Sequence, residues 1–517
     1  MGGAKRQKKA PLSGNTRKEG SNEEVLLFDV DSLRQSRQHE VSSNEVSNVN
    51  VEALPERFSE VDVEISSLSS TGDGIGTSEG SPHVYVVPFT IAGDKAKAKI
   101  FNQFEKKHYS LTDLVRIIRP SPQRNDALIG CKYFGTCGGC QLQMLPYDDQ
   151  LQHKKQIIEK AYRNFSALAP EAVPAVRDTI GSPKQYGYRT KLTPHFDGPP
   201  RSKIKEAKRT GQSVFQSVPP MGFMMKGSRR TLDIEDCPIG TDAVREGMKT
   251  ERKRVAEEIG KYMKGATLLL RESTTRESCA VNGSSSADVG QNDSEKAAVP
   301  FIESRTCITD SNAMATEYVN DFVFENTAGS FFQNNNSVLP SFTDYIRSHI
   351  IPPNSQGGTA IEHLVDAYCG SGLFTVTLSS LFTSSIGIDI APSSITAAKK
   401  NAELNNVKNA TFMTADAAAL FEKIKFPADR AAVVIDPPRK GCDEAFLKQL
   451  LAFGPKRVVY VSCNVHTQAR DVGFLVEGLG GPRYEIESLQ GFDFFPQTGH
   501  VEGVAILQRC GKADREE

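Results

Sequence analysis

Short apolar runs alternate with longer, helix-like segments over residues 304–517. The runs include L-V-D-A-Y, S-I-G-I-D-I, A-V-V-I-D and R-V-V-Y-V-S, and most of them are rich in valine and isoleucine. β-branched residues in runs of this length favour buried strands, and strands that alternate with helices are typical of a mostly parallel sheet. We therefore predict an α/β fold for residues 304–517, with a doubly wound, Rossmann-like sheet.

A different pattern, in which apolar and polar residues alternate, covers residues 58–126. The segments V-D-V-E-I, V-Y-V-V-P-F and K-A-K-A-K-I-F predict the short strands of a small β-barrel. The third segment carries Lys95, Lys97 and Lys99, which project from one face because side chains alternate along a strand. This face is either a surface that follows the phosphates of a nucleic acid or an ordinary solvated strand.

Residues 127–303 mix helical and strand patterns, and we predict a central α+β domain there. A helix is expected over residues 142–165, followed by a strand pattern. Residues 1–57 and 271–300 are polar and have no sustained apolar period, so we predict that both segments are disordered.

Overall composition is that of an ordinary soluble protein, and only local charge points to a partner. The 517 residues carry a formal net charge of −1, with 38% hydrophobic and 24% charged residues. No signal-peptide pattern is present, and no run approaches the roughly 18 apolar residues of a membrane span, so we expect a cytoplasmic or nuclear protein. Residues 201–230, however, hold eight basic residues and one acidic residue. This segment predicts a surface that binds nucleic acid.

The basic residues near the start of the chain have three possible roles: a nuclear-import signal, a loose nucleic-acid arm or a solvated tail.

Three cysteines, Cys131, Cys137 and Cys140, are spaced C-x5-C-x2-C, and Cys237 in D-C-P is a fourth candidate ligand. Cysteines this dense in a chain without a disulfide framework predict a metal site, and thiolate ligands narrow the choice to zinc or iron–sulfur. We favour a [4Fe-4S] cluster because a Cys-Pro ligand occurs in ferredoxins and because the glycines at 138 and 139 leave backbone amides free to point at cluster sulfurs. The alternative is that these cysteines only pack.

The turn D-A-Y-C-G-S-G follows an apolar strand and leads into a helix, which is the position of a cofactor-binding loop. Gly370 and Gly372 let the backbone close over a ligand, and Asp389 lies nineteen positions after Gly370, as expected for a carboxylate that binds a ribose hydroxyl. A dinucleotide site would have a third small residue where Thr375 stands. This departure favours S-adenosylmethionine over NAD. Asp436 ends a later strand of the same series.

Cys463 directly follows the apolar run R-V-V-Y-V-S. Open α/β sheets bind ligands at the carboxyl ends of their strands, so a cysteine at this position faces a cleft and is a candidate nucleophile. The alternative is a small buried hydrophobe. A nucleophilic thiol needs a nearby positive charge or a proton acceptor. Arg439 in D-P-P-R could supply that charge, or it could contact a phosphate. Glu502, at the start of the last apolar strand, is a candidate general base.

Taken together, these motifs resemble the RNA (uracil-5-)-methyltransferases that use S-adenosylmethionine. The resemblance covers residues 61–508 and includes a barrel like the TRAM domain of that family, the cysteine cluster, and the motifs F-F-Q-N-N, D-A-Y-C-G-S-G, D-P-P-R, S-C-N and G-H-V-E. It implies that Cys463 is the nucleophile and Glu502 the base. The cofactor-binding residues that we expect are Gln333, Tyr368, Gly370, Gly372, Asp389, Asp416 and Asp436. Contacts with RNA are expected from Lys95, Lys97, Lys99, Arg189 and Arg439.

The chemistry of uracil explains why such an enzyme needs a thiol. Carbon 5 becomes nucleophilic only after a thiolate has added to carbon 6, and the proton on carbon 5 must later be removed by a base. Members of the family modify the T loop of tRNA or ribosomal RNA, and we expect tRNA because the polar tail and insertion resemble those of eukaryotic tRNA enzymes. Two other functions are open: methylation of an exocyclic nitrogen or a small molecule with Cys463 structural, and RNA binding by a protein with a vestigial methyltransferase domain.

Overall fold

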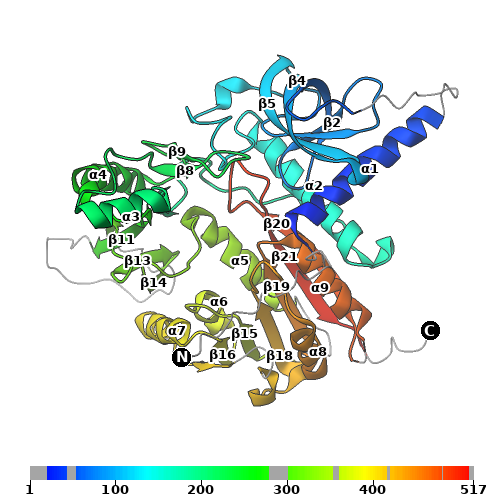
Figure 1. The fold of residues 1–517 in the computed structure, drawn as a ribbon. Coiled ribbons are helices and arrows are strands. Elements are labelled where there is room, and N and C mark those ends of the chain that lie inside the picture. The colour runs from blue at the N-terminus through cyan, green and yellow to red at the C-terminus, as the bar shows by residue number, and fades with distance from the viewer. Residues whose placement is uncertain are drawn as a thin grey trace, which may run out of the picture.

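The structure is a computed structural model, and it describes residues 20–42, 54–278, 301–352, 360–415, 420–479 and 481–511. Figure 1 shows an N-terminal barrel at one end of the molecule, a large C-terminal sheet with helices at the other end, and a central domain beside them. None of the described helices is long and apolar enough to cross a membrane.

Five strands form a closed barrel in the order β1-β2-β3-β5-β4, which confirms the barrel predicted for this part of the chain. Their bounds are β1 (Glu60–Leu68), β2 (Gly74–Thr77), β3 (Val84–Val87), β4 (Lys95–Phe104) and β5 (Tyr109–Arg119). Alternate residues of β1 and β4, among them Val63, Ile65 and Ile100, fill the barrel interior. The intervening residues face outward, as the pleat of a strand requires.

A helix, α1 (Asn22–Ser42), packs against the outside of the barrel. Leu26, Val30 and Leu33 form a stripe at spacings of four and three, and this stripe contacts a buried patch of β2, β3 and β5. The prediction of disorder is therefore wrong for residues 22–42. A stripe this narrow gives a weak periodic signal within a polar segment, because α1 is held by the barrel rather than by its own propensity. The rest of the predicted tail up to residue 53 lies outside the described residues, apart from the two that precede α1.

In the part of the central domain that the structure describes, there are three α-helices, a few single-turn 3-10 helices and three small sheets. The helices are α2 (Tyr147–Phe165), α3 (Arg201–Thr210) and α4 (Asp242–Glu258). The sheets have the orders β10-β7-β8-β9, β12-β11-β6 and β13-β14. Their strands are β6 (Lys191–Leu192), β7 (His195–Phe196), β8 (Gly222–Met224), β9 (Thr231–Asp233), β10 (Ala266–Thr267), β11 (Leu270–Ser278), β12 (Phe301–Ile308), β13 (Met314–Val319) and β14 (Phe322–Thr327).

The predicted insertion at 271–300 begins with ordered structure. Residues 271–278 belong to β11, which pairs antiparallel with β12, so the prediction of disorder is wrong for these residues. The sequence of β11 is polar and gives no strand pattern. The strand forms because its backbone pairs with β12, which follows the insertion in the sequence. Residues 279–300 lie outside the described residues.

The C-terminal domain contains a seven-stranded sheet of order β17-β16-β15-β18-β19-β21-β20, in which only β21 runs against its neighbours. The strands are β15 (His363–Ala367), β16 (Ser384–Asp389), β17 (Ala410–Thr414), β18 (Ala431–Ile435), β19 (Arg457–Ser462), β20 (Tyr484–Phe492) and β21 (Glu502–Arg509). The helices are α5 (Leu339–Ile350), α6 (Leu373–Leu378), α7 (Pro392–Leu404), α8 (Glu444–Phe453) and α9 (Val465–Glu477).

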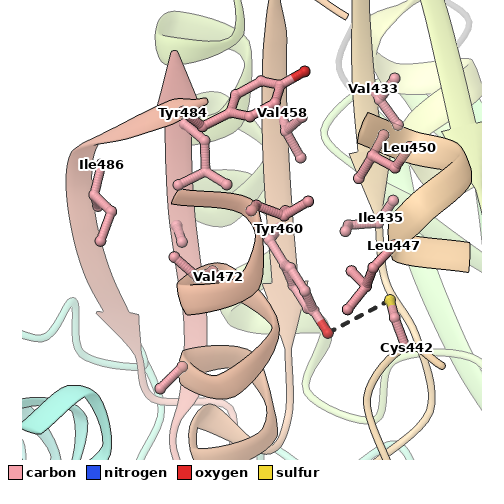
Figure 2. Close-up of a cluster of buried hydrophobic side chains, with 14 of the residues drawn as sticks. Val433, Ile435, Cys442, Leu447, Leu450, Val458, Tyr460, Val472, Tyr484 and Ile486 are labelled. Atoms are coloured by element: carbon pink, nitrogen blue, oxygen red, sulfur yellow. Dashed lines mark hydrogen bonds between the residues drawn. The ribbon is translucent and has the colours of Figure 1, made fainter. Parts of the chain in front are cut away.

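Helices cover both faces of this sheet, which confirms the doubly wound prediction. On β18, Val433 and Ile435 contact a cluster that includes α2, α8 and α9, whereas Val434 between them contacts a cluster with α5 and α6. Figure 2 shows the first cluster, where Leu447 and Leu450 of α8 lie against β18 and β19. Both faces are buried, which explains why the strands read as continuous apolar runs.

Candidate active site

The carboxyl edge of the parallel strands brings the predicted site residues together. Asp389 is the last residue of β16, Asp436 directly follows β18, and Cys463 directly follows β19. Glu502 is the first residue of β21. Because β21 runs antiparallel to β19, with Ser462 opposite Gly503, its first residue lies at the edge where β19 ends.

A cavity of about 610 Å³ opens at this edge. Its lining includes most of the residues predicted from the sequence: Gln333, Tyr368, Gly370, Asp389, Asp436, Arg439, Cys463 and Glu502. A volume of this size is typical of a site for a cofactor or small molecule. Gly372 does not line the cavity, and Asp416 lies outside the described residues.

Asp389 is held in place by the loop that follows β15. The Gly370 amide donates to Oδ2 at 3.1 Å, and the Ala391 amide donates to Oδ1 at 2.8 Å. A carboxylate oxygen can accept more than one hydrogen bond, so Asp389 keeps acceptor capacity toward the cavity. Gly372 has a φ of 91° and lies against α7, where an added Cβ would stand 3.3 Å from the Ala398 Cβ. Its contribution is close helix packing behind the loop.

Thr375, which argued against a dinucleotide site, satisfies a buried carboxyl group beneath the loop. Asp366 is fully buried and accepts hydrogen bonds from the Thr375 amide at 2.8 Å and the Thr375 hydroxyl at 2.5 Å. Burial raises the pKa of Asp366 to about 7 despite these bonds. The threonine therefore has a structural reason at this position.

Cys463 is half-buried, and its pKa is raised to about 11, chiefly by burial. The charges of Glu502 and Asp436 also raise this pKa, whereas the nearby Arg439 guanidinium lowers it. Burial therefore favours the protonated thiol at neutral pH.

Two carboxyl groups, those of Glu502 and Asp436, line the cavity. Glu502 is 2% exposed, and its pKa is raised well above the ordinary value by burial and by Asp436. Burial also raises the pKa of Asp436. A carboxyl group with a raised pKa is a stronger base once ionised, as a group that removes a proton from carbon must be.

A second cavity, of about 530 Å³, lies on another side of Cys463. Cys463 and Arg439 line both cavities, and the second is completed by α1, the barrel and the central domain. The Asn464 side chain donates to the Gly20 carbonyl at 3.3 Å, so the start of α1 lies beside the nucleophile candidate. Cys463 is thus accessible from a space enclosed by all parts of the molecule.

The four clustered cysteines line a separate cavity of about 220 Å³, together with Arg189. Cys131, Cys137, Cys140 and Cys237 are therefore neighbours in space, and burial raises the pKa of Cys140 and Cys237 to about 12. Among the described residues, no group of three or more His, Cys, Asp or Glu side chains is arranged to hold a metal ion.

The two glycine amides at the cysteine cluster differ. The Gly139 amide lowers the pKa of the Cys137 thiol, so it lies near that sulfur. The Gly138 amide instead donates to the Met224 carbonyl at 2.9 Å, so the expectation that it is free is wrong.

The lysine face of the barrel is largely neutralised. Lys99, Lys97 and Lys95 of β4 lie opposite Glu60, Asp62 and Glu64 of β1. Lys97 approaches Asp62 at 2.8 Å, and Lys95 approaches Glu64 at 3.6 Å. By contrast, five basic residues of α3 have no carboxylate partner among the described residues: Arg201, Lys203, Lys205, Lys208 and Arg209.

Comparison with known proteins decides the family. A model of the tRNA (Uracil-5-)-methyltransferase family matches residues 311–510. A curated Schizosaccharomyces pombe protein described as tRNA (uracil(54)-C(5))-methyltransferase is 42% identical over 508 residues, covering 98% of this chain and 86% of the relative. The chain belongs to the tRNA (uracil-5-)-methyltransferase family.

Two further comparisons agree with this membership. A Saccharomyces cerevisiae relative with the same description is 38% identical and is matched over 94% of this chain and 81% of its own length. The crystal structure of a Pyrococcus abyssi tRNA (uracil-54, C5)-methyltransferase in complex with S-adenosyl-L-homocysteine aligns with a TM-score of 0.57 at 23% identity, covering 86% of this chain and all of that one. At this identity the likeness establishes a shared fold.

Several residues that line the cofactor-sized cavity of this methyltransferase were not predicted from the sequence. They are Phe331 and Asn334 of the F-F-Q-N-N motif, Ser393 and Ser394 at the start of α7, and Phe495 in the loop before Glu502. The position of Ser393 and Ser394 just after Asp389 was the available signal. Phe495 had none, because its segment is far from the cofactor loop in sequence.

The raised pKa of Cys463 predicts how fast the thiol reacts with iodoacetamide. Between pH 6 and 9 the alkylation rate of the Cys463 peptide should rise about tenfold per pH unit without levelling off, because only the thiolate reacts. Arg439→Gln should slow alkylation at every pH, whereas Arg439→Lys, which keeps the positive charge, should have a smaller effect. Mass spectrometry of the Cys463 peptide measures both rates. A plateau near pH 7 in the wild-type protein would contradict the raised pKa.

Proposed function

We propose that the protein transfers a methyl group from S-adenosylmethionine to carbon 5 of a uridine in tRNA, in the cytoplasm or nucleus. Uridine 54, in the T loop, is the position named for the yeast and fission-yeast relatives. The observation that carries the proposal is the convergence of Cys463, Glu502 and the Asp389 loop on one cavity. A thiol, a buried base and a cofactor-sized space are the parts that this reaction needs.

The cavity suits the methyl donor. Asp389 retains acceptor capacity for ribose hydroxyls, and Gln333, Tyr368, Gly370 and Asp436 complete the proposed lining. When bound, S-adenosylmethionine supplies an electrophilic methyl group on a positively charged sulfur. The carboxyl groups of Asp436 and Glu502 favour a positive charge nearby.

In the proposed reaction Cys463 attacks carbon 6 of the uracil as a thiolate. The thiol first releases its proton to solvent. As the C6–S bond forms, the π electrons of the carbon 5–carbon 6 bond move into an enolate. The electrons at carbon 5 then form the bond to the methyl group, whose bond to the donor sulfur breaks and leaves that sulfur as a neutral thioether. Glu502 removes the proton from carbon 5, the double bond re-forms, and the thiolate leaves carbon 6. Arg439 assists by lowering the pKa of the thiol.

RNA must present the uridine flipped out of its stack, because a paired base cannot reach a thiol between two cavities. The second cavity, enclosed by α1, the barrel and the central domain, has room for the strand around the target. The unpaired cations of α3 are suited to binding phosphates, with Arg439 closer to the reaction. We further propose that the barrel is a TRAM-like RNA-binding domain, although its lysines Lys95 and Lys97 are already paired with carboxylates.

Two substitutions test the mechanism on a tRNA transcript. Cys463→Ala should abolish methyl transfer and leave S-adenosylmethionine binding intact, because the thiol takes part only in chemistry. Glu502→Gln should accumulate a covalent, methylated RNA–protein adduct, because methylation precedes the blocked elimination. Filter binding with labelled cofactor and denaturing gels measure these outcomes. Turnover by Cys463→Ala would refute the thiol mechanism and favour a structural Cys463.

We also propose that the four cysteines hold a [4Fe-4S] cluster. Cys131, Cys137, Cys140 and Cys237 line one cavity. The Cys-Pro sequence at Cys237 and the close spacing of the other three cysteines support a cluster over zinc. We expect a role in folding, because methyl transfer moves no electrons.

Anaerobically purified protein should be brown, absorb at about 400 nm and contain about four irons per chain. Cys137→Ser should lose the colour and iron, whereas Cys307→Ser, which alters a cysteine outside this cavity, should keep both. Zinc without iron in elemental analysis would overturn the cluster assignment.

A further inference from the structure

The segment that joins β20 to β21, from Asp493 to Val501, ends directly before Glu502 and is held by a buried charge. The side chains of Lys154, on α2, and Asp493 are both fully buried. The Lys154 ammonium donates to Asp493 Oδ1 at 2.5 Å and to the Phe495 carbonyl at 3.0 Å. Two points of this segment are therefore fixed to α2.

Other polar contacts complete the anchoring of Asp493. The Tyr147 hydroxyl donates to Asp493 Oδ2 at 2.9 Å, and the Phe495 amide donates to Oδ1 at 3.0 Å. The Tyr147 oxygen in turn accepts from the Ser182 amide at 2.7 Å. Both carboxylate oxygens are thus hydrogen-bonded, and these bonds hold the start of the segment in place.

The middle of the segment is fixed by a reciprocal amide pair. The backbone amide of Gln497 donates to the Gln150 side-chain oxygen, Oε1, at 3.0 Å. The Gln150 side-chain nitrogen, Nε2, donates to the Gln497 side-chain oxygen, Oε1, at 3.1 Å. Gln497 has a φ of 71°, in the left-handed region that side chains other than glycine rarely adopt. Gln150 lies on α2, one turn before Lys154, so a single helix holds both parts of the segment.

A buried ion pair is a costly way to obtain stability, because both charges lose their hydration and apolar residues of similar size are often as stable. The Lys154–Asp493 pair instead sets the position of the segment that precedes Glu502. Phe495 lines the cofactor-sized cavity, and the segment leads into Glu502 with no intervening turn of helix or strand. Phe492, the residue before Asp493, pairs with Glu502 across β20 and β21, so the anchor at Asp493 acts one residue from the strand partner of the base.

We propose that Lys154 is a positioning residue for the proton-abstraction step: through Asp493 and Phe495 it holds the segment that aims Glu502 at the substrate beside Cys463. The proposal rests on the proposed function, because it assigns Lys154 to the step in which Glu502 acts. Lys154 itself lines neither of the two cavities that contain Cys463.

The double variant Lys154→Met/Asp493→Asn removes both charges at nearly constant shape, so no unpaired buried charge remains. It should bind S-adenosylmethionine as the wild type does and still form the methylated adduct with a tRNA transcript. Breakdown of the adduct should be slower by about 10- to 100-fold, because the base is displaced from its proton. Rapid-quench sampling on denaturing gels measures adduct formation and decay separately.

A control is the buried Arg457, which begins β19 at the end away from Cys463. Arg457 is fully buried and pairs with Glu487 at 2.7 Å. The double variant Arg457→Met/Glu487→Gln should lower the melting temperature without raising the steady-state level of adduct. Tyr147→Phe, which removes one hydrogen bond to Asp493 and no charge, should slow adduct decay in the same direction by a smaller factor.

The wild-type and Glu502→Gln proteins distinguish a failure of the proposed function from a failure of the positioning role of Lys154. No methylation by the wild type, or no adduct with Glu502→Gln, would refute the proposed function or its base. If those two behave as expected, adduct accumulation in Lys154→Met/Asp493→Asn and in Tyr147→Phe supports the positioning role. Unchanged adduct decay in Tyr147→Phe, or loss of activity in the double variant only in proportion to loss of folded protein, would overturn it.

Discussion

The antiparallel pairing of β21 with β19 is the constraint on which the site depends. In a fully parallel sheet, the first residue of a strand lies at the edge opposite the ligand-binding edge. Reversal of β21 places its first residue, Glu502, at the edge where β19 ends and Cys463 begins the next turn. One strand reversal therefore brings together a thiol and a carboxyl group separated by 39 positions in the sequence.

That arrangement has an electrostatic consequence. The site gathers Cys463, Asp436 and Glu502 where burial opposes ionisation of all three, and Arg439 is the cation that offsets part of this effect on the thiol. Burial thus shifts all three groups toward their protonated forms. A positively charged methyl donor in the cavity would favour their ionised forms, so binding of the cofactor and activation of the thiol are expected to be linked.

The sequence was sufficient for the C-terminal domain because its strands are buried on both faces and end at residues with recognisable chemistry. Asp389, Asp436 and Cys463 could each be placed at a strand end from pattern alone. The failures share a different cause, namely contacts between distant segments. The apolar stripe of α1 is explained only by the barrel, and the polar strand β11 only by β12.

Local charge was incomplete for the same reason. The sequence places Lys95, Lys97 and Lys99 on one face of β4, but only the register shows that they lie opposite carboxylates on β1. Lys154 gave no signal either, because its partner Asp493 is 339 positions away. Local pattern therefore predicts elements and strand ends, whereas ion pairs and loop anchors require the fold.

The central claim is that this chain makes 5-methyluridine in tRNA by means of Cys463. The most direct measurement is nucleoside mass spectrometry of separated tRNA and ribosomal RNA from cells lacking the protein, complemented with the wild-type or the Cys463→Ala chain. We expect 5-methyluridine to disappear from the tRNA of these cells, to be restored by the wild type and not to be restored by Cys463→Ala. Unchanged 5-methyluridine in tRNA, with loss from ribosomal RNA alone, would contradict the assigned substrate, and restoration by Cys463→Ala would contradict the mechanism.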